Sequence, residues 1–137
     1  MKTTMYDILR EISEIEKASD RVQALQNHKY VNAIKQVCEY TFSSGIKWLL
    51  PEGEPPYKPC EFVDVEGRFI SELRKLYLFV EGGNPNLTKL RRESLFIQLI
   101  ESIDPKDAKL LVSMKEGKMP FKGITKKIVQ QAFPDIK

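Results

Sequence analysis

Four prolines stand within nine residues of this chain, at positions 51, 55, 56 and 59. Each proline fixes its φ angle and lacks a backbone N–H, so the stretch can form neither a helix nor a central strand. We predict a long connection of extended or polyproline type over residues 51–59. A loop of this kind in a small domain is either functional or held down by its aromatic neighbours.

Apolar side chains recur at steps of three and four residues on both sides of this loop, which is typical of amphipathic helices. The only hint of a strand is at residues 60–63. The sequence therefore predicts an all-α fold, a single compact domain over residues 1–137 with about six to seven helices. The expected helices cover residues 4–17, 19–28, 30–42, 67–81, 86–102, 105–116 and 122–133.

The same periodicity predicts which side chains face the core. Tyr77 and Leu90 fall on the apolar sides of their helices, and Cys38 is expected to be a buried free thiol. Trp48 stands where helix gives way to the proline-rich loop. We expect its indole to pack back onto the helical body, the alternative being that it stacks on a ligand.

The net charge of +3 conceals an asymmetry between the two halves of the chain. Residues 1–66 carry 8 Lys/Arg against 11 Asp/Glu, whereas residues 67–137 carry 14 against 8. A basic C-terminal half is compatible with binding either nucleic acid or an acidic protein. No stretch approaches the ~20 consecutive apolar residues of a membrane helix, and the N-terminus lacks the apolar run of a signal peptide. We expect a cytoplasmic protein without a membrane partner.

Catalytic and metal-binding patterns are missing from the sequence. The only histidine, His28, has no cysteine or carboxylate at ligand spacing. Neither a phosphate-binding loop nor a dinucleotide fingerprint is present. Glu11 and Glu14 are paired carboxylates, but they fall on the exposed face of an amphipathic helix. We expect no enzymatic activity, no metal and no cofactor.

The last thirty residues contain two helical patterns joined by a basic turn. Asp104 is a candidate N-cap, Pro105 suits the first helical position, and Asp107 suits the acidic position of a capping box. The second helix is expected to begin at Lys122-Gly123. A glycine turn that leads into a lysine-rich helix N-terminus is a good phosphate seat. The alternative is a solvated loop between two helices.

Taken in order, these segments resemble the N-terminal DNA-binding domain of ATP-dependent DNA ligases, with the closest likeness to the T-even-type bacteriophage ligase. The resemblance covers nearly the whole chain, as a free-standing small phage protein. The sequence has no KxDG motif, whose lysine becomes adenylated in the ligases, so ligation chemistry is not implied. The resemblance lies in residues 8–12, 24–25, 33–37, 40–46, 87–100, 109–112 and 123–129.

The resemblance implies a non-specific double-stranded DNA-binding accessory protein of phage replication, repair or transcription, which acts through backbone contacts in an infected bacterial host. The alternative is an adaptor that keeps the ligase-domain fold but binds a protein such as RNA polymerase or a sliding clamp. A contiguous patch of C-terminal lysines would favour DNA, and scattered lysines would favour the adaptor. The expected DNA-binding residues are Ser44, Gly45, Lys47, Lys118, Lys122, Gly123, Thr125, Lys126 and Lys127.

Overall fold

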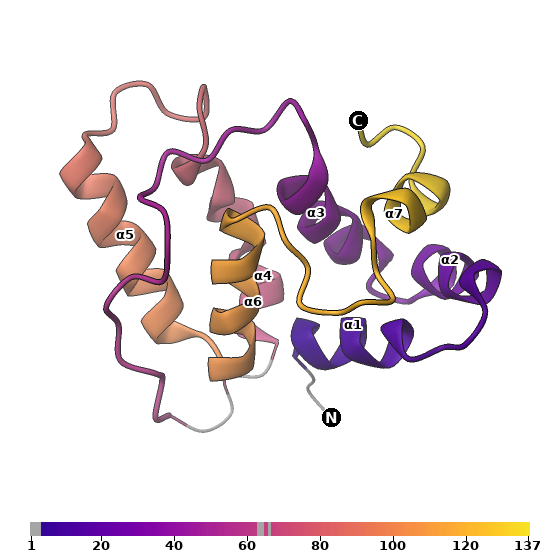
Figure 1. The fold of residues 1–137 in the computed structure, drawn as a ribbon. Coiled ribbons are helices and arrows are strands. Elements are labelled where there is room, and N and C mark those ends of the chain that lie inside the picture. Colours follow the sequence, from indigo (N-terminus) through magenta and orange to yellow (C-terminus); the bar gives the residue numbers. More distant parts are fainter. Residues whose placement is uncertain (1–3, 63–64, 66) are drawn as a thin grey trace.

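The computed structural model describes residues 4–62, 65 and 67–137 (Figure 1). Apart from one isolated bridge, this part of the chain contains helices and no strand, which confirms the predicted all-α class. The helices are α1 (Met5–Ser13), α2 (Ala18–Asn27), α3 (Val31–Phe42), α4 (Arg68–Glu72), the 3-10 helix η1 (Leu73–Phe79), α5 (Lys89–Ser102), α6 (Pro105–Lys115) and α7 (Lys126–Ala132).

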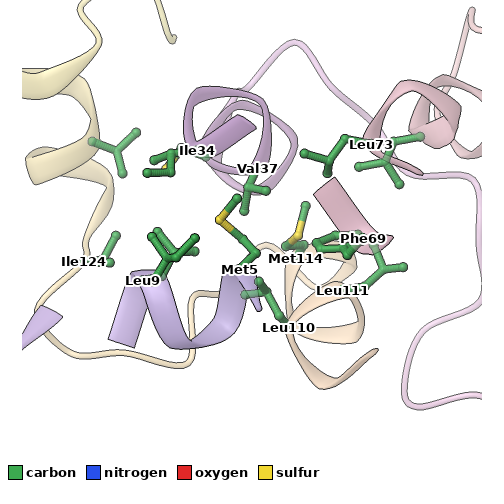
Figure 2. Close-up of a cluster of buried hydrophobic side chains, with 14 of the residues drawn as sticks. Met5, Leu9, Ile34, Val37, Phe69, Leu73, Leu110, Leu111, Met114 and Ile124 are labelled. Atoms are coloured by element: carbon green, nitrogen blue, oxygen red, sulfur yellow. The ribbon is translucent and has the colours of Figure 1, made fainter. Parts of the chain in front are cut away.

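The first helices of the chain pack against the last ones. α1 contacts α6, and α2 contacts α7, while α3 lies against α2, α6 and η1. α5 packs beside α6 and η1 on the other side of the molecule (Figure 1). The core between these helices combines side chains from both halves of the chain, so neither half buries its apolar surface alone. Figure 2 shows part of this core, including Met5, Leu9, Ile34, Val37, Phe69, Leu73, Leu110, Leu111, Met114 and Ile124.

Local sequence signals set several helix starts. The Asp104 carboxylate accepts a hydrogen bond of 2.9 Å from the Lys106 N–H, and Pro105 occupies the first turn, both as predicted. The hydroxyls of Thr4 and Thr88 cap α1 and α5 in the same manner. These caps satisfy N–H groups that have no partner within their own helix.

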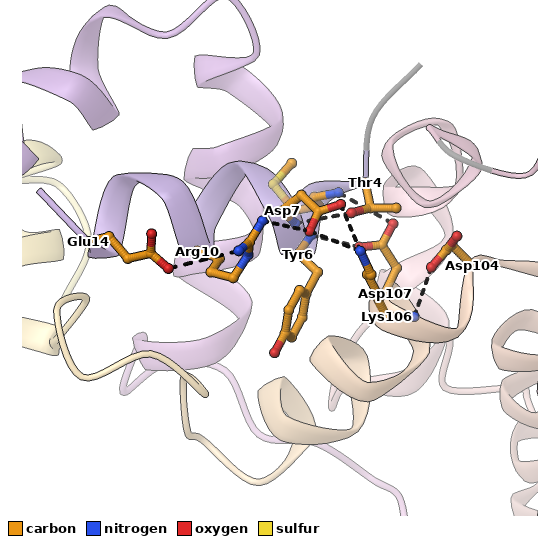
Figure 3. Close-up of polar contacts among 9 residues, drawn as sticks. Thr4, Tyr6, Asp7, Arg10, Glu14, Asp104, Lys106 and Asp107 are labelled. Atoms are coloured by element: carbon orange, nitrogen blue, oxygen red, sulfur yellow. Dashed lines mark hydrogen bonds and ion pairs between the residues drawn. The ribbon is translucent and has the colours of Figure 1, made fainter. Parts of the chain in front are cut away.

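Asp107 does not complete a capping box within α6, and that prediction is wrong. Its carboxylate instead accepts hydrogen bonds from the backbone N–H groups of Tyr6, at 2.8 Å, and Met5, at 3.4 Å (Figure 3). Beside it, the Lys106 ammonium lies 3.2 Å from the Asp7 carboxylate. Asp107 therefore holds the N-terminus of α1, because the unpaired N–H groups there need acceptors from elsewhere. Lys106 adds an ion pair with Asp7 at the same end of the helix.

Several predicted helices are longer than the observed ones, and two of them differ most in form. The first was expected to reach residue 17 but ends at Ser13, and the chain turns there before α2 begins. The pattern at 67–81 is divided into the five-residue α4 and the 3-10 helix η1. A 3-10 helix has three residues per turn, so side chains predicted at α-helical spacing rotate off the core side.

That rotation accounts for one error in the predicted core. Tyr77 was expected inside, but it lies in η1 and is 47% exposed. Leu90, also expected inside, is 80% exposed in the first turn of α5, which reaches beyond the core. Cys38 is buried and unpaired as predicted, and its burial raises the pKa of the thiol to about 12.

The suggested strand at 60–63 is not present over residues 60–62, and Val63 lies outside the described residues. The observed bridge joins Trp48 to Val80 instead. It brings the segment after α3 alongside the end of η1. From there the proline-rich loop runs as an extended connection across α5, as predicted for residues 51–59 (Figure 1).

Candidate functional site

Two of the predicted DNA-binding residues meet at a hollow of about 570 Å³. It lies between the C-terminal end of α3, the segment after it, and the turn that follows α6. We call it the α3–α6 hollow. Its lining residues are Tyr40, Thr41, Ile46, Lys47, Trp48, Leu50, Glu52, Lys115, Glu116, Gly117 and Lys118.

Lys47 reaches the hollow because its backbone is fixed on both sides. Its carbonyl oxygen accepts a hydrogen bond of 2.8 Å from the Glu81 N–H, and the Leu49 N–H donates to the Phe79 carbonyl at 2.8 Å. These bonds flank the bridge between Trp48 and Val80. The Lys47 side chain is exposed. Lys47 thus presents an exposed ammonium group from a backbone that is held in place.

Lys118 reaches the hollow through a tight turn at the end of α6. Gly117 adopts a φ of 74°, in the left-handed region that glycine enters without steric cost. The Ser113 hydroxyl then donates to the Lys118 carbonyl at 2.6 Å, and the Lys118 N–H donates to the Ser113 carbonyl at 3.0 Å. The exposed Lys118 side chain is therefore held at the rim by its own backbone.

Two aromatic side chains form one wall of the hollow. The indole N–H of Trp48 donates to the Tyr40 carbonyl at 2.9 Å, and the two rings meet edge to face with centroids 5.9 Å apart. Both side chains are half-buried against the core. This confirms that Trp48 packs back onto the helical body. Burial also raises the pKa of the Tyr40 phenol, so Tyr40 is neutral near pH 7.

Lys115 and Glu116 hold the proline-rich loop, and their own charges are paired with each other. The Lys115 side chain is 2% exposed, and its ammonium donates to the carbonyls of Pro51 and Gly53 at 2.8 and 2.9 Å and to Glu116 at 3.1 Å. The other Glu116 oxygen accepts from the Gly53 N–H at 2.7 Å. This bond and the Lys115 ammonium lower the pKa of Glu116. The charges left for a ligand are those of Lys47, Lys118 and Glu52.

The other residues that were predicted to bind DNA beside Lys47 have different surroundings. The Ser44 hydroxyl donates to the Lys137 carbonyl at 2.9 Å, so its hydrogen is already bonded to an oxygen of the same chain and not to a phosphate. The Gly45 N–H donates to the Ser43 hydroxyl at 3.3 Å. Ser44 and Gly45 are exposed but do not line the α3–α6 hollow, so only Lys47 of this group belongs to it.

Gly123 has a structural role that its sequence context did not predict. A Cβ atom at this position would lie 2.2 Å from the carbonyl oxygen of Ser13, at the end of α1. The expectation that Gly123 lets a phosphate approach its backbone stays a prediction. The absent side chain admits the backbone of α1. Lys122, next to it, is exposed beside that contact.

The last helix begins four residues later than predicted, at Lys126. Thr125 is its N-cap, and its hydroxyl accepts from the Ile128 N–H at 3.3 Å, which removes one N–H group from the expected phosphate seat. The helix is seven residues long and packs on α2, where the Gln26 amide donates to the Ala132 carbonyl at 3.0 Å. Lys126 and Lys127 are exposed in its first turn.

The structure therefore brings Lys47 and Lys118 to one hollow, whereas Lys122 lies in the connection to α7 and Lys126 and Lys127 lie in α7 itself. The sequence did not reveal that Lys115 and Glu116 hold the proline-rich loop, since nothing local distinguishes a buried lysine from a solvated one. Gly117 was the available signal, because a glycine after a helix marks the turn that aims Lys118. In the described ranges, no three His, Cys, Asp or Glu side chains are grouped to hold a metal ion.

The geometry defines an all-α domain with a basic and aromatic hollow. Comparison with known protein families places the chain: residues 8–120 match a family of unknown function (DUF6433), and the chain belongs to this family. No curated protein and no solved structure gave a match. None of the helices in the described part is both long and apolar enough to cross a membrane.

Proposed function

We propose that the chain is a non-enzymatic accessory protein that binds double-stranded DNA through the phosphate backbone, without reading the base sequence. The observation that carries this proposal is the meeting of Lys47 and Lys118 at one hollow, from segments far apart in the chain. Two free ammonium groups on rigid backbones are suited to phosphates, because phosphate contacts need charge and position but no sequence information.

The surrounding chain supports the same proposal. Lys122 is exposed in the connection between α6 and α7, and Lys126 and Lys127 are exposed in the first turn of α7, so further positive charge lies on the segment that follows the hollow. Among the described residues, Glu52 is the one carboxylate of the lining without an ion pair or a side-chain hydrogen bond, and its repulsion would set the side on which the DNA backbone passes. The resemblance to a ligase DNA-binding domain agrees with this mode of contact. We place the protein in the cytoplasm of a phage-infected bacterium, in replication, repair or transcription.

The test is fluorescence anisotropy with labelled duplexes of unrelated sequence at two salt concentrations. Wild type should bind them with similar affinity, and the affinity should fall steeply with salt. Lys47→Glu with Lys118→Glu should weaken binding to all of them and lower the magnitude of the log–log salt slope by about 2, at about 0.9 per lost phosphate contact.

The matched control is Lys29→Glu with Lys109→Glu, which changes the net charge equally at two exposed sites outside the hollow. Equal losses in the two double variants would mean that only the net charge matters. Unchanged binding in the Lys47 and Lys118 variant, with the fold intact, would reject the DNA proposal and leave the protein adaptor to be pursued.

A further inference from the structure

A second cavity, of about 310 Å³, lies under the proline-rich loop on the surface of α5. We call it the proline-loop cavity. Figure 1 shows the loop crossing α5 at this place. The cavity adjoins the α3–α6 hollow, since Leu50, Glu52 and Lys115 line both. Its lining residues are Leu50, Pro51, Glu52, Gly53, Glu54, Pro55, Pro56, Glu93, Phe96, Ile97 and Lys115.

The floor of the proline-loop cavity is apolar. Phe96 and Ile97 of α5 and Leu50 supply it, and the aliphatic stem of Lys115 adds to it. The Lys115 ammonium is saturated by its three oxygen partners, so it presents no charge to the cavity. An apolar floor with saturated polar groups favours a hydrophobic side chain over a polar one.

The roof of the cavity is fixed at both ends. Lys115 and Glu116 hold the backbone at Pro51 and Gly53, and the Lys58 N–H donates to the Glu101 carboxylate of α5 at 2.8 Å. Between these bonds stand Pro55 and Pro56, whose rings restrict the backbone. The cavity is thus formed before a ligand arrives, and binding costs little ordering of the loop.

Three carboxylates surround the opening: Glu52 and Glu54 from the loop and Glu93 from α5. Within the described residues, none of the three takes part in an ion pair or a side-chain hydrogen bond. Glu52 and Glu54 are exposed on the loop. The rim therefore has a net negative charge that a cationic ligand would complement.

We propose that the proline-loop cavity binds a peptide segment of another protein, with one large apolar side chain inserted and Lys or Arg on either side of it. The size of the cavity suits a single anchoring side chain of the type that dominates interface energetics. A ligand that fills it and also reaches the exposed Glu52 and Glu54 must extend past the opening, which a chain does and a compact small molecule does not. The proposed occupant differs from DNA, because the carboxylates of this cavity repel phosphates.

The experiment uses fluorescein-labelled peptide Lys-Lys-Leu-Trp-Lys-Lys as the probe, followed by anisotropy at moderate salt. The same peptide with glutamate in place of each lysine, and a third with alanine in place of Leu-Trp, are the controls. Saturable binding of the first peptide, and none of the acidic one, is the expected result. Loss of the apolar pair should weaken binding about tenfold, which corresponds to about 1.4 kcal/mol, because one apolar anchor dominates such an interface.

The protein variants test the charged rim and the apolar floor of the cavity separately. Glu54→Lys with Glu93→Lys should weaken binding about tenfold, whereas Glu39→Lys with Glu81→Lys changes the net charge equally at exposed sites outside the cavity and should have little effect. Ile97→Trp fills the cavity without a charge change and should also weaken binding. Circular dichroism checks that each variant is folded. If the charge variant misfolds, Ile97→Trp still tests the cavity, because a half-buried position such as Ile97 can accept a larger side chain.

Several results would overturn the proposal. One is equal weakening by the two charge-reversed pairs, since binding would then follow net charge alone. Others are an unchanged affinity in folded Ile97→Trp, equal binding of the acidic peptide, and equal binding of the peptide without Leu-Trp. Failure of all these peptides to bind would reject the site and leave the DNA proposal untouched.

Discussion

The carboxylate of Asp107 accepts a 2.8 Å hydrogen bond from the backbone N–H of Tyr6, a residue 101 positions earlier in the chain. Asp107 is fully buried, and this burial raises the pKa of its carboxyl group to about 7 against the lowering effect of the N–H groups of Tyr6 and Met5. The nearby carboxylates of Asp104 and Asp7 add to the rise. The contact between α1 and α6 is therefore sensitive to pH.

We predict that Asp107 makes the protein less stable as the pH rises from about 4 to about 7. In this range the folded carboxyl keeps its proton while the unfolded one, with its ordinary pKa of 3.8, has lost it. The proton is thus bound more tightly by the folded state, and raising the pH through 7 removes that stabilisation. The total effect is on the order of a few kcal/mol.

Asp107→Asn isolates this effect, because its amide keeps an acceptor oxygen for Tyr6 but does not titrate. The measurement is urea unfolding of variant and wild type at several pH values. Relative to wild type, the variant should gain stability between pH 4 and 7 and show no further change above about pH 8. A difference that stays constant over the whole range would contradict the assigned pKa.

Gly123→Ala should destabilise the protein by about 3 kcal/mol, because the new Cβ would collide with the Ser13 carbonyl and force the backbones apart. Gly45→Ala is the matched control, since its Cβ would meet only the Ser43 hydroxyl, at 3.8 Å. Thermal unfolding followed by circular dichroism gives both values. Equal melting temperatures for the two variants would show that the α1 contact tolerates a side chain.

Lys115→Met should release the proline-rich loop while the helices stay folded. The carbonyls of Pro51 and Gly53 would lose their donor, at a cost of about 1–3 kcal/mol. The bond between Glu52 and Gly53 should then be cut faster by a glutamate-specific protease. Lys118→Met removes an exposed lysine of the same turn, and the protease should cut this variant at the wild-type rate. Equal rates for all three proteins would mean that Lys115 does not hold the loop.

Lys122→Glu with Lys126→Glu tests whether DNA extends from the α3–α6 hollow toward α7. If both lysines contact phosphates, all duplexes should bind more weakly, with a salt slope smaller in magnitude by about 2. The melting temperature should barely change, because exposed substitutions usually lie within about 0.5 kcal/mol of neutral. Unaltered affinity at low salt, with the fold intact, would confine the contact to Lys47 and Lys118.

The protein should not react with ATP, because the sequence has no KxDG lysine to adenylate. Incubation with α-labelled ATP and Mg²⁺, followed by gel electrophoresis, should give no labelled protein. An intact ATP-dependent ligase treated in parallel shows that the assay works. A labelled lysine adduct in this chain would overturn the non-enzymatic proposal.

The sequence predicts those features of the fold that depend on neighbouring residues. Asp104 and Pro105 start α6 because a cap and a proline act within one turn, and α3 follows its apolar periodicity over its full length. Asp107 obeys the same local pattern but serves α1 instead. A capping pattern indicates that a hydrogen-bond acceptor is present. The packing of the helices decides which N–H groups donate to that acceptor.

The candidate site was predictable to a smaller extent. Lys47 and Lys118 were identified separately as basic residues beside turns, but their shared hollow depends on how α3 and α6 pack. At Gly123 a glycine signals a close approach, but the sequence alone does not reveal that the backbone of α1 is what approaches it. The prediction that Leu90 is buried is wrong because periodicity reveals the apolar side of a helix but not where the core ends.

The fastening of α1 by Asp107 also bears on how the protein forms during synthesis. α1 has nine residues, too few to be stable by itself in water, and it leaves the ribosome before α6. Its acceptor is made 101 residues later, about 5–20 s at ordinary rates of translation. α2 packs on α7, which is made later still. Both helices are thus made well before the helices that hold them in place, and they settle only after those are complete.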